Sequence, residues 1–193
     1  MALSNIVRLT NGLRKVKMAD LEEEGIWGEV YEVADLTAMS AETVEGDSTY
    51  AAGNAIIYSK KSVGKTNGSL SFYGMSDATE AKLFDIREAK NGGKIYGMRA
   101  NKGYKAVIIE CTAVNPATGI EEDVHIIFPK VALGMISDQG TTKDADGNEQ
   151  IDTKSLAFTA LALDNEFKTY KYINTGATPA QLTADMFVEK PSV

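Results

Sequence analysis

The stretch YKAVIIECTAVNPATGIEEDVHIIFPK, residues 104 to 130, decides the fold. In its first half every second residue is apolar, which places on one face of an extended chain Val107, Ile109, Cys111 and Ala113. The turn sequence NPATG follows, and the second half repeats the alternation with Val124, Ile126 and Phe128. This pattern predicts an antiparallel β-hairpin with one buried face.

The only cysteine and the only histidine of the chain lie in this hairpin. Cys111 belongs to the all-apolar face, so we interpret it as a packed core thiol. His125 lies on the more mixed face, and we interpret it as a structural residue. One residue of each kind argues against disulfides, Cys/His zinc sites and catalytic triads that need histidine. We therefore predict that the protein is not an enzyme and has no catalytic residue.

The segment SDATEAKLFDIREAKNGG, residues 76 to 93, carries the signals of a helix. Ser76 or Asp77 can cap its beginning, and Glu80 stands where a capping box places an acidic residue. Asn91-Gly92-Gly93 is a stop signal. The sequence predicts an amphipathic helix over about residues 77 to 90 that packs on a sheet.

Short alternating runs separated by Gly, Asn and Asp make up most of the remaining chain. Residues 27 to 46 predict two strands or one long bent strand, residues 48 to 58 a third, and further strands are KVALGMIS, TKSLAFTALALD and FKTYKYIN. The ends show little apolar periodicity. We expect an N-terminal arm over residues 1 to 20, one β domain over 21 to 175, and a C-terminal arm over 176 to 193. The fold class is α+β and mainly β: an antiparallel sandwich or barrel with one flanking helix and extended arms.

The stretch SKKSVGKTNG, residues 59 to 68, ends in the Gly-Lys-Thr of a phosphate-binding loop. Such a loop needs a glycine where this sequence has Ser59, and a helix that begins at the Lys-Thr pair. Here Leu70 and Phe72 alternate with polar residues, which predicts a strand after an Asn67-Gly68 turn. We interpret the stretch as a basic connection between two strands and expect no nucleotide cofactor.

The segment KDADGNEQID, residues 143 to 152, has the alternating oxygen side chains of a calcium loop. Its glycine, Gly147, stands at position four instead of six when Asp144 is counted as position one, and no helices are predicted on either side. We interpret it as a hairpin loop with an Asp-Gly turn. We therefore predict no metal site.

The charge of the chain is concentrated in one acidic segment. The 193 residues have a hydrophobic share of 44%, a charged share of 24% and a net charge of -7, as in an ordinary globular protein. Residues 18 to 59 contain ten Asp and Glu residues and no Lys or Arg. Such a surface repels phosphate, so we expect no sequence-independent binding of nucleic acid. It is either a solvated face or a surface that repels an anionic partner.

Neither a secretory signal nor a membrane helix is predicted. The sequence MALSNIVRLTNGLRK lacks the apolar centre of about 7 to 15 residues that a secretory signal requires. No run of about 18 apolar residues occurs. We expect a protein that is made and kept in a cytoplasm.

The order of these elements resembles the major tail protein family of long-tailed bacteriophages, the tail tube subunits. The resemblance covers roughly residues 27 to 175: an acidic strand pair, STYAAGNAII, the strand-to-helix unit GSLSFYGMSDATEAKLFDI, YKAVIIECTAV paired with a strand ending in FPK, VALGMIS and SLAFTALAL. It implies a β-sandwich-like domain that forms hexameric rings, which stack into a tube through which DNA passes at infection. A related fold serves in contractile tails and in the type VI secretion tube, so the tail type stays open.

The resemblance also implies location and partners. We expect assembly in the host cytoplasm, a place in the virion tail, and contacts with tape measure, tail terminator and distal tail proteins. Double-stranded DNA would pass without specific binding, and no membrane is involved. The alternative is a ligand-binding or adhesive β domain of a virion or bacterial cell, which would also be non-enzymatic.

The acidic segment supplies candidates for a wall that faces the tube lumen. Strand alternation places Glu29, Tyr31, Val33 and Asp35 on one side. Glu29 and Asp35 are the first candidates. Glu42 and Glu45 are candidates of lower rank, because these two residues fall on opposite faces of the strand. An acidic lumen would lower friction on DNA.

Overall fold

The predicted hairpin is present at the centre of the molecule. The structure, a computed structural model, describes residues 9–52, 55–97, 103–138, 151, 153–163, 172–175 and 178–187. Strand β7, Lys105–Val114, pairs antiparallel with β8, Glu121–Asp138, and Ile109 lies opposite Ile126. The turn between them contains Gly119, whose positive φ of 69° suits a residue without a Cβ atom.

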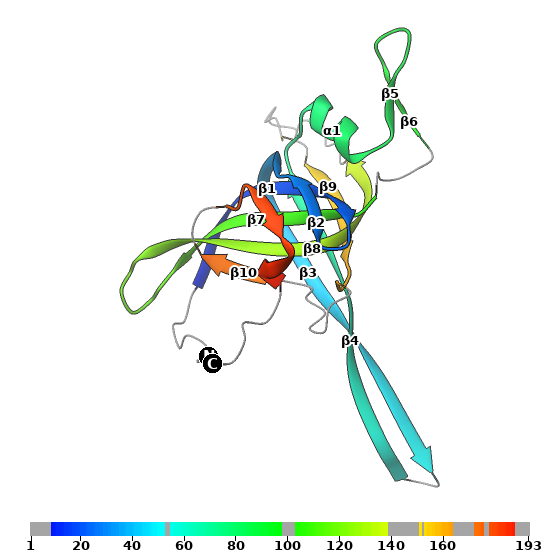
Figure 1. The fold of residues 1–193 in the computed structure, drawn as a ribbon, viewed down its shortest axis with the longest axis vertical. Coiled ribbons are helices and arrows are strands. Elements are labelled where there is room, and N and C mark those ends of the chain that lie inside the picture. Colours follow the sequence, from blue (N-terminus) through cyan, green and yellow to red (C-terminus); the bar gives the residue numbers. More distant parts are fainter. Residues whose placement is uncertain are drawn as a thin grey trace, which may run out of the picture.

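Six antiparallel strands close into a ring (Figure 1). Besides β7 and β8 these are β1 (Leu9–Glu23), β3 (Tyr31–Ala52), β4 (Ala55–Phe72) and β9 (Lys154–Ala160). Each strand pairs with the next in the order β1, β3, β4, β9, β8, β7 and back to β1. The predicted fold class, mainly β and barrel-like with one flanking helix, is confirmed.

The inside of the ring is the main hydrophobic core. Strand alternation points apolar side chains of all six strands inward, and the rings of Phe128 and Phe158 meet there at 5.3 Å. Cys111 is buried in this core, as predicted, and its thiol donates a hydrogen bond to the Val124 carbonyl. The core side chains include Val16, Met18, Leu36, Leu70, Phe72, Val107, Ile109, Val131, Leu133 and Leu156.

A second layer covers the outer face of β7 and β8. It consists of β2 (Ile26–Glu29), β11 (Gln181–Thr183) and the short 3₁₀ helix η1 (Ala184–Phe187). Trp27 of β2 is buried, and its indole N–H donates to the Pro129 carbonyl at 2.9 Å. Its ring lies 5.2 Å from that of Phe187. Residues of β7 are therefore buried on both sides of the sheet.

Both predicted arms differ from the structure. Residues 9 to 20 belong to β1, where Val16, Met18 and Ala19 are fully buried. In the predicted C-terminal arm, Leu182 and Phe187 are buried against Trp27 and its neighbours. The prediction failed because the apolar residues of both segments are few and irregularly spaced.

Strand β8 continues through Pro129 and joins two predicted strands, the one ending in FPK and KVALGMIS. The segment VALGMIS is the second half of β8 and not a separate strand. The β7–β8 register is irregular beside Pro129, between Lys105 and Val107, and β8 pairs with β9 from Val131 onward. Proline has no N–H to donate, and it is tolerated at such an irregularity where the strand changes partner.

The flanking helix begins where predicted but is shorter. Helix α1 runs over Asp77–Leu83, and the Ser76 hydroxyl accepts a hydrogen bond from the Thr79 N–H at 3.1 Å. Phe84 is extended, with φ −122° and ψ 161°, so the helix ends there and not near residue 90. The chain continues into the hairpin of β5 (Ile86–Glu88) and β6 (Lys94–Tyr96), and the predicted stop signal forms the turn of that hairpin.

The long strands β3 and β4 differ from the prediction in three places: the new strand expected from residue 48, the connection over residues 59 to 68 and the Asn67-Gly68 turn. Residues 31 to 52 are one strand, and the predicted basic connection over residues 59 to 68 lies within β4. Asn67-Gly68 is not a turn, because both residues pair with β3 on one side and with β9 on the other. A Cβ atom on Gly68 would lie 2.4 Å from the Phe158 ring and 2.4 Å from the Ser40 carbonyl oxygen. Glycine is therefore required there for close packing. The remaining strand is β10 (Tyr172–Thr175), which pairs with β8.

The close approach at Gly68 gives a stability prediction. Gly68→Ala should lower the free energy of unfolding by about 1–3 kcal/mol, because the added methyl group overpacks the barrel wall. Chemical denaturation followed by far-UV circular dichroism measures the change. Gly74→Ala is the matched control, because nothing lies within 4 Å of the added Cβ atom. Equal stability of the two variants would contradict the packing assigned to Gly68.

Candidate functional site: a projecting hairpin and a polar barrel face

The β3–β4 hairpin extends well beyond the barrel (Figure 1). β3 pairs with β1 only from Tyr31 to Asp35, and β4 pairs with β9 only from Thr66 to Phe72. From Glu45 to the turn, the two strands pair only with each other in the described part of the chain. Both edges of the hairpin therefore present backbone N–H and C=O groups, which other strands can pair with.

The outer face of β3, β4 and β9 beside this hairpin is polar. Leu70 and Phe72 point into the barrel, so the alternate residues of β4 point outward. The hydroxyls of Ser40 and Ser69 lie 2.9 Å apart, and Asn67 accepts a hydrogen bond from Thr159 at 3.1 Å. Hydroxyl and amide groups without apolar cover make this face suited to contact with water.

A β-bulge changes the predicted faces of the acidic segment. Lys17 pairs with Glu32 and Val16 with Ala34, so Val33 is an extra residue in β3. Val33 and Ala34 are both buried in the core. The prediction that Tyr31 and Val33 share one face with Glu29 and Asp35 is therefore wrong: Tyr31 and Val33 pack against the core, whereas Asp35 is exposed.

The four candidate carboxylates are all exposed, but the structure does not place them in one row. Asp35 and Glu42 lie on the outer face of β3, since Leu36 points inward and an irregularity follows it. Glu29 belongs to β2, and Glu45 lies beyond a further register irregularity at the base of the projecting hairpin. Asp35 and Glu42 are thus the pair that shares the polar face.

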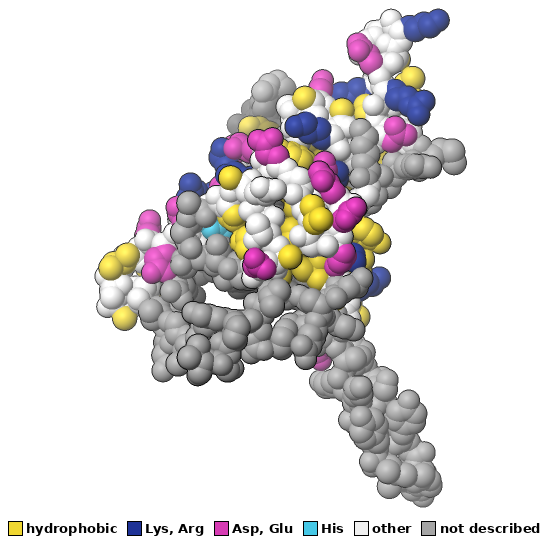
Figure 2. All heavy atoms as spheres, in the orientation of Figure 1, with side chains coloured by type: hydrophobic (Ala, Val, Ile, Leu, Met, Phe, Trp, Pro, Cys, Tyr) yellow, Lys and Arg dark blue, Asp and Glu magenta, His cyan; other side chains and the backbone are white. Residues whose placement is uncertain are grey.

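A basic side chain, Lys15, partly balances the negative charge beside this face. Lys15 lies opposite Asp35 on β1, and its Nζ donates to Glu32 at 2.8 Å. This hydrogen bond and the nearby carboxylates raise the pKa of Lys15, although burial acts in the opposite direction. Figure 2 shows Asp and Glu side chains spread over the body, while several Lys and Arg side chains gather at the end that carries α1.

An ion-pair network ties α1 to the β5–β6 hairpin. The buried Glu80 carboxylate accepts hydrogen bonds from Lys94 and Tyr96, both at 2.7 Å, and Lys94 also contacts Asp77 at 2.6 Å. Burial by itself would raise the pKa of Glu80, but these two donors outweigh it and leave the pKa below its ordinary value. The network holds the helix and the hairpin together as one unit at this end of the molecule.

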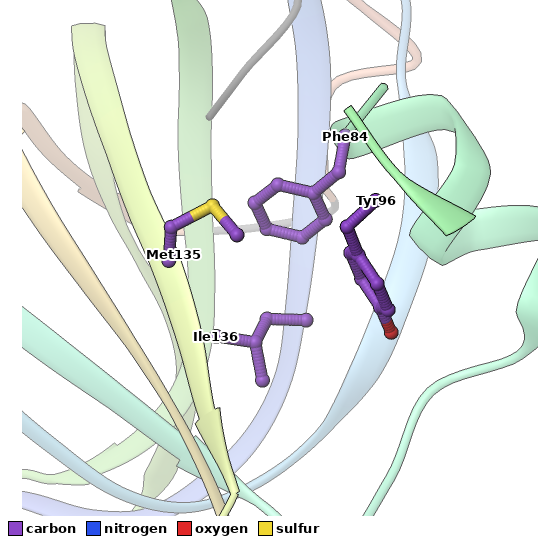
Figure 3. A pocket seen from close by; sticks show the side chains of 4 residues that line it. All are labelled: Phe84, Tyr96, Met135 and Ile136. Carbon is purple, nitrogen blue, oxygen red and sulfur yellow. The ribbon is translucent and has the colours of Figure 1, made fainter. Parts of the chain in front are cut away.

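A small apolar pocket lies between this unit and the barrel (Figure 3). It has a volume of about 200 Å³ and is lined by Phe84, Tyr96, Met135 and Ile136. The Tyr96 hydroxyl points to Glu80 and not into the pocket's apolar wall. The pocket is smaller than the roughly 300–1,000 Å³ of most small-molecule sites, and it has few polar groups to orient a ligand.

Sequence reasoning missed a buried polar cluster on the outer face of β7 and β8. Glu110 and His125 lie opposite each other, and both side chains are buried. Lys17 contacts Glu110 at 2.7 Å, and the Thr178 hydroxyl also donates to Glu110. The sequence carried a signal for this cluster. Glu110 and His125 each interrupt an apolar run, and the length of the turn between β7 and β8 brings the two positions opposite each other.

The structure also locates the two motif-like stretches. Lys65 and Thr66 lie in β4, so the helix that a phosphate-binding loop requires does not follow them. Of residues 143 to 152, only Ile151 is described, so the calcium-like loop lies outside the described residues. Within the described ranges, no group of three or more His, Cys, Asp or Glu residues is arranged to hold a metal ion. The helices described there are too short to span a bilayer.

Comparisons with known proteins give little similarity. No protein family matches the sequence, and no curated protein matches it. One similar solved structure is the cryo-EM structure of the anti-feeding prophage cap, the AFP tube terminating cap. The sequences are 17% identical, the match covers 84% of this chain and 89% of that chain, and the TM-score is 0.42. A TM-score this low does not establish a common fold.

The Glu80 network gives a prediction on titration. Lys94→Met should raise the pKa of Glu80 relative to the wild type, because it removes the larger of the two hydrogen bonds that oppose the effect of burial on this pKa. In the wild type the lowered pKa stabilises the fold above about pH 4.5, and this stabilisation is lost as the pH falls through the lowered pKa. NMR titration of the Glu80 carboxyl group measures both values. Lys90→Met is the control. Lys90 lies in the turn of the β5–β6 hairpin, and its replacement should leave the pKa of Glu80 unchanged.

Proposed function

We propose that this chain is a structural subunit of a phage-tail-like tube, in which six copies form a ring and the rings stack. The observation that carries the proposal is the projecting part of the β3–β4 hairpin, beyond Glu45 and Val63, whose edges pair with no other strand in the described residues. A long two-stranded hairpin is marginal by itself in water, and pairing with a neighbouring copy satisfies its edge groups. The sequence resemblance to tail tube subunits is an independent support.

The arrangement of the molecule suits stacking of rings. The projecting hairpin and the unit of α1 with β5 and β6 lie at opposite ends of the long axis (Figure 1). Each end of a subunit can then contact the copy above or below it. Tape measure, tail terminator and distal tail proteins are the partners that such a tube requires at its inside and its ends.

The polar face of β3, β4 and β9 is our candidate for the lumen wall. Asp35 and Glu42 project from it, and its other outward groups are mainly hydroxyls and amides. Glu29 and Glu45 remain candidates because both are exposed. A wall of this kind repels phosphate and offers no bidentate donor to it, so DNA can pass without binding. The proposed role is non-enzymatic and places the protein in the tail of a particle assembled in the host cytoplasm.

The hairpin provides a direct test of the proposal. Glu45 and Val63 lie opposite each other, so residues 46 to 62 can be replaced by a two-residue Asn-Gly turn. The shortened protein should fold, with Trp27 emission and circular dichroism like the wild type, but should form no rings or tubes. Electron microscopy and sedimentation compare it with the wild type.

The wild-type outcome separates the possible roles. Tubes support the tube subunit, and rings that do not stack favour a cap at the end of a tube. A wild-type protein that stays monomeric under all conditions contradicts the proposal and favours a ligand-binding or adhesive domain. Tubes formed by the shortened protein would exclude the hairpin as the assembly element.

The lumen assignment is tested by charge reversal. Tubes that carry Asp35→Lys together with Glu42→Lys should bind short double-stranded DNA, since each ring of six subunits gains twelve lysines in place of twelve carboxylates in the proposed hexamer. Binding should weaken as salt is raised, by the release of counterions. Fluorescence anisotropy of labelled DNA measures it, and wild-type tubes should show none. Glu88→Lys, at the β5–β6 hairpin, is the control, and equal binding by both variants would place the lumen elsewhere.

A further inference from the structure

The C-terminal segment Thr178–Phe187, here called the strap, closes over one side of the barrel. Its strand β11 pairs with β2, where Gln181 lies opposite Glu29. Leu182 and Phe187 are buried with Trp27 in the outer hydrophobic cluster. The strap has few backbone pairs, so the closed position depends largely on these side chains and on the contact at its first residue.

That first contact is a polar one in a buried place. The Thr178 hydroxyl donates to the Glu110 carboxylate, and its oxygen lies 2.9 Å from Nε2 of His125. Glu110 also accepts from Lys17 at 2.7 Å. His125 is only 3% exposed, so the strap and the sheet together exclude water from its ring.

The hydrogen bonds determine where the proton of His125 lies. A hydroxyl has one proton, and Thr178 gives it to Glu110, because a carboxylate can only accept. Thr178 must therefore accept a hydrogen bond from an Nε2–H of His125. Nδ1 then carries a lone pair, and it is buried with no hydrogen-bond partner among the described residues. A proton added at Nδ1 would be a buried donor without an acceptor, and it would carry a charge.

The charges around His125 come from three strands. Glu110 on β7 and Asp123 on β8 favour a positive imidazolium, while Lys17 and Arg14 on β1 oppose it. Arg14 and Asp123 contact each other at 2.6 Å, and Lys17 contacts Glu110, so these four charges are paired. Thr178 of the strap and Asn174, which lies opposite His125 on β10, carry no charge.

We propose that the strap is released by acid, because a proton on Nδ1 of His125 is a buried charge without an acceptor, and loss of the Thr178 contact at Nε2 opens one edge of the ring to water. This inference is independent of the proposed tube function. Release would expose the outer apolar face of β7 and β8 and one side of Trp27. The strap is thus a conformational device that responds to pH.

The sign of the effect follows from the pKa of His125. Burial lowers this pKa from its ordinary value of 6.5, and the Glu110 and Asp123 carboxylates only partly oppose the shift. The closed strap is therefore fully stabilised above about pH 6.5 and loses stability as the pH falls toward the lowered pKa. In that range the ratio of open to closed strap rises by at most about tenfold per pH unit for one proton. The pKa of Glu110 lies below its ordinary 4.5, because donors outweigh the burial that would raise it, so Glu110 stays ionised throughout.

The chain contains its own reporter for this motion. Trp27 is the only tryptophan, and it lies against Phe187 of the strap. We expect its fluorescence emission to move to longer wavelength as the pH falls from 8 to below 6.5, while far-UV circular dichroism stays constant. Phe187→Ala at pH 8 gives the emission of Trp27 without its strap contact. In His125→Gln, which cannot take up a proton, the emission should not change over this range.

A second variant and a control complete the test. Thr178→Val keeps the size of the side chain but removes the hydroxyl, so the closed strap loses a hydrogen bond and the transition should move to higher pH. Asp123→Asn, exposed and outside the strap contact, should retain the transition. The proposal is overturned by constant wild-type emission, by an unchanged transition in His125→Gln or Thr178→Val, or by loss of circular dichroism at the same pH.

Discussion

The ring of strands closes at one short place, and the rest of the architecture depends on it. Residues Lys15 to Met18 of β1 pair with β3 on one side and with β7 on the other. Val16 and Met18 of this segment are fully buried, so four residues join the sheet and two of them also fill its centre. Beyond this contact β1 follows β7 while β3 leaves with β4. The projecting hairpin is the direct result, because two long strands continue where their neighbours end.

Closure also explains why the barrel needs an outer cover. β7 is buried on both faces, with Ile109 in the inner core and Ile108 in the outer cluster. Without β2 and the strap, the outer apolar residues of β7 and β8 would form an exposed patch, which is a site for association. The polar groups Glu110 and His125 lie at the margin of this covered area, where the Thr178 hydroxyl contacts both. The cover therefore combines apolar packing at Trp27 with a buried polar contact at its other end.

The sequence predicted the parts of the fold whose signals are local. Strict alternation identified β7 and the first half of β8, and Ser76 identified the start of α1. It failed where tertiary contacts decide: the bulge at Val33 reverses the alternation, and Gly68 is a packing residue instead of a turn residue. β1 was missed because its buried residues stand between Lys15, Lys17 and Asp20, whose charges ion-pair with other strands. The sequence predicted that the candidate site is acidic. It predicted neither that Asp35 and Glu42 share one face nor that the hairpin is long.

The projecting hairpin poses a problem for a single chain. Long unpaired strand edges promote aggregation, because each edge residue leaves backbone N–H and C=O groups for a further strand. Beyond the barrel, β3 and β4 pair with each other from Glu45 and Val63 to Ala52 and Ala55, and among the described residues no third strand joins them. The barrel removes the edges of its six strands by closing on itself, but this closure does not reach the hairpin. The same two strands therefore have satisfied edges at the barrel and open edges beyond it.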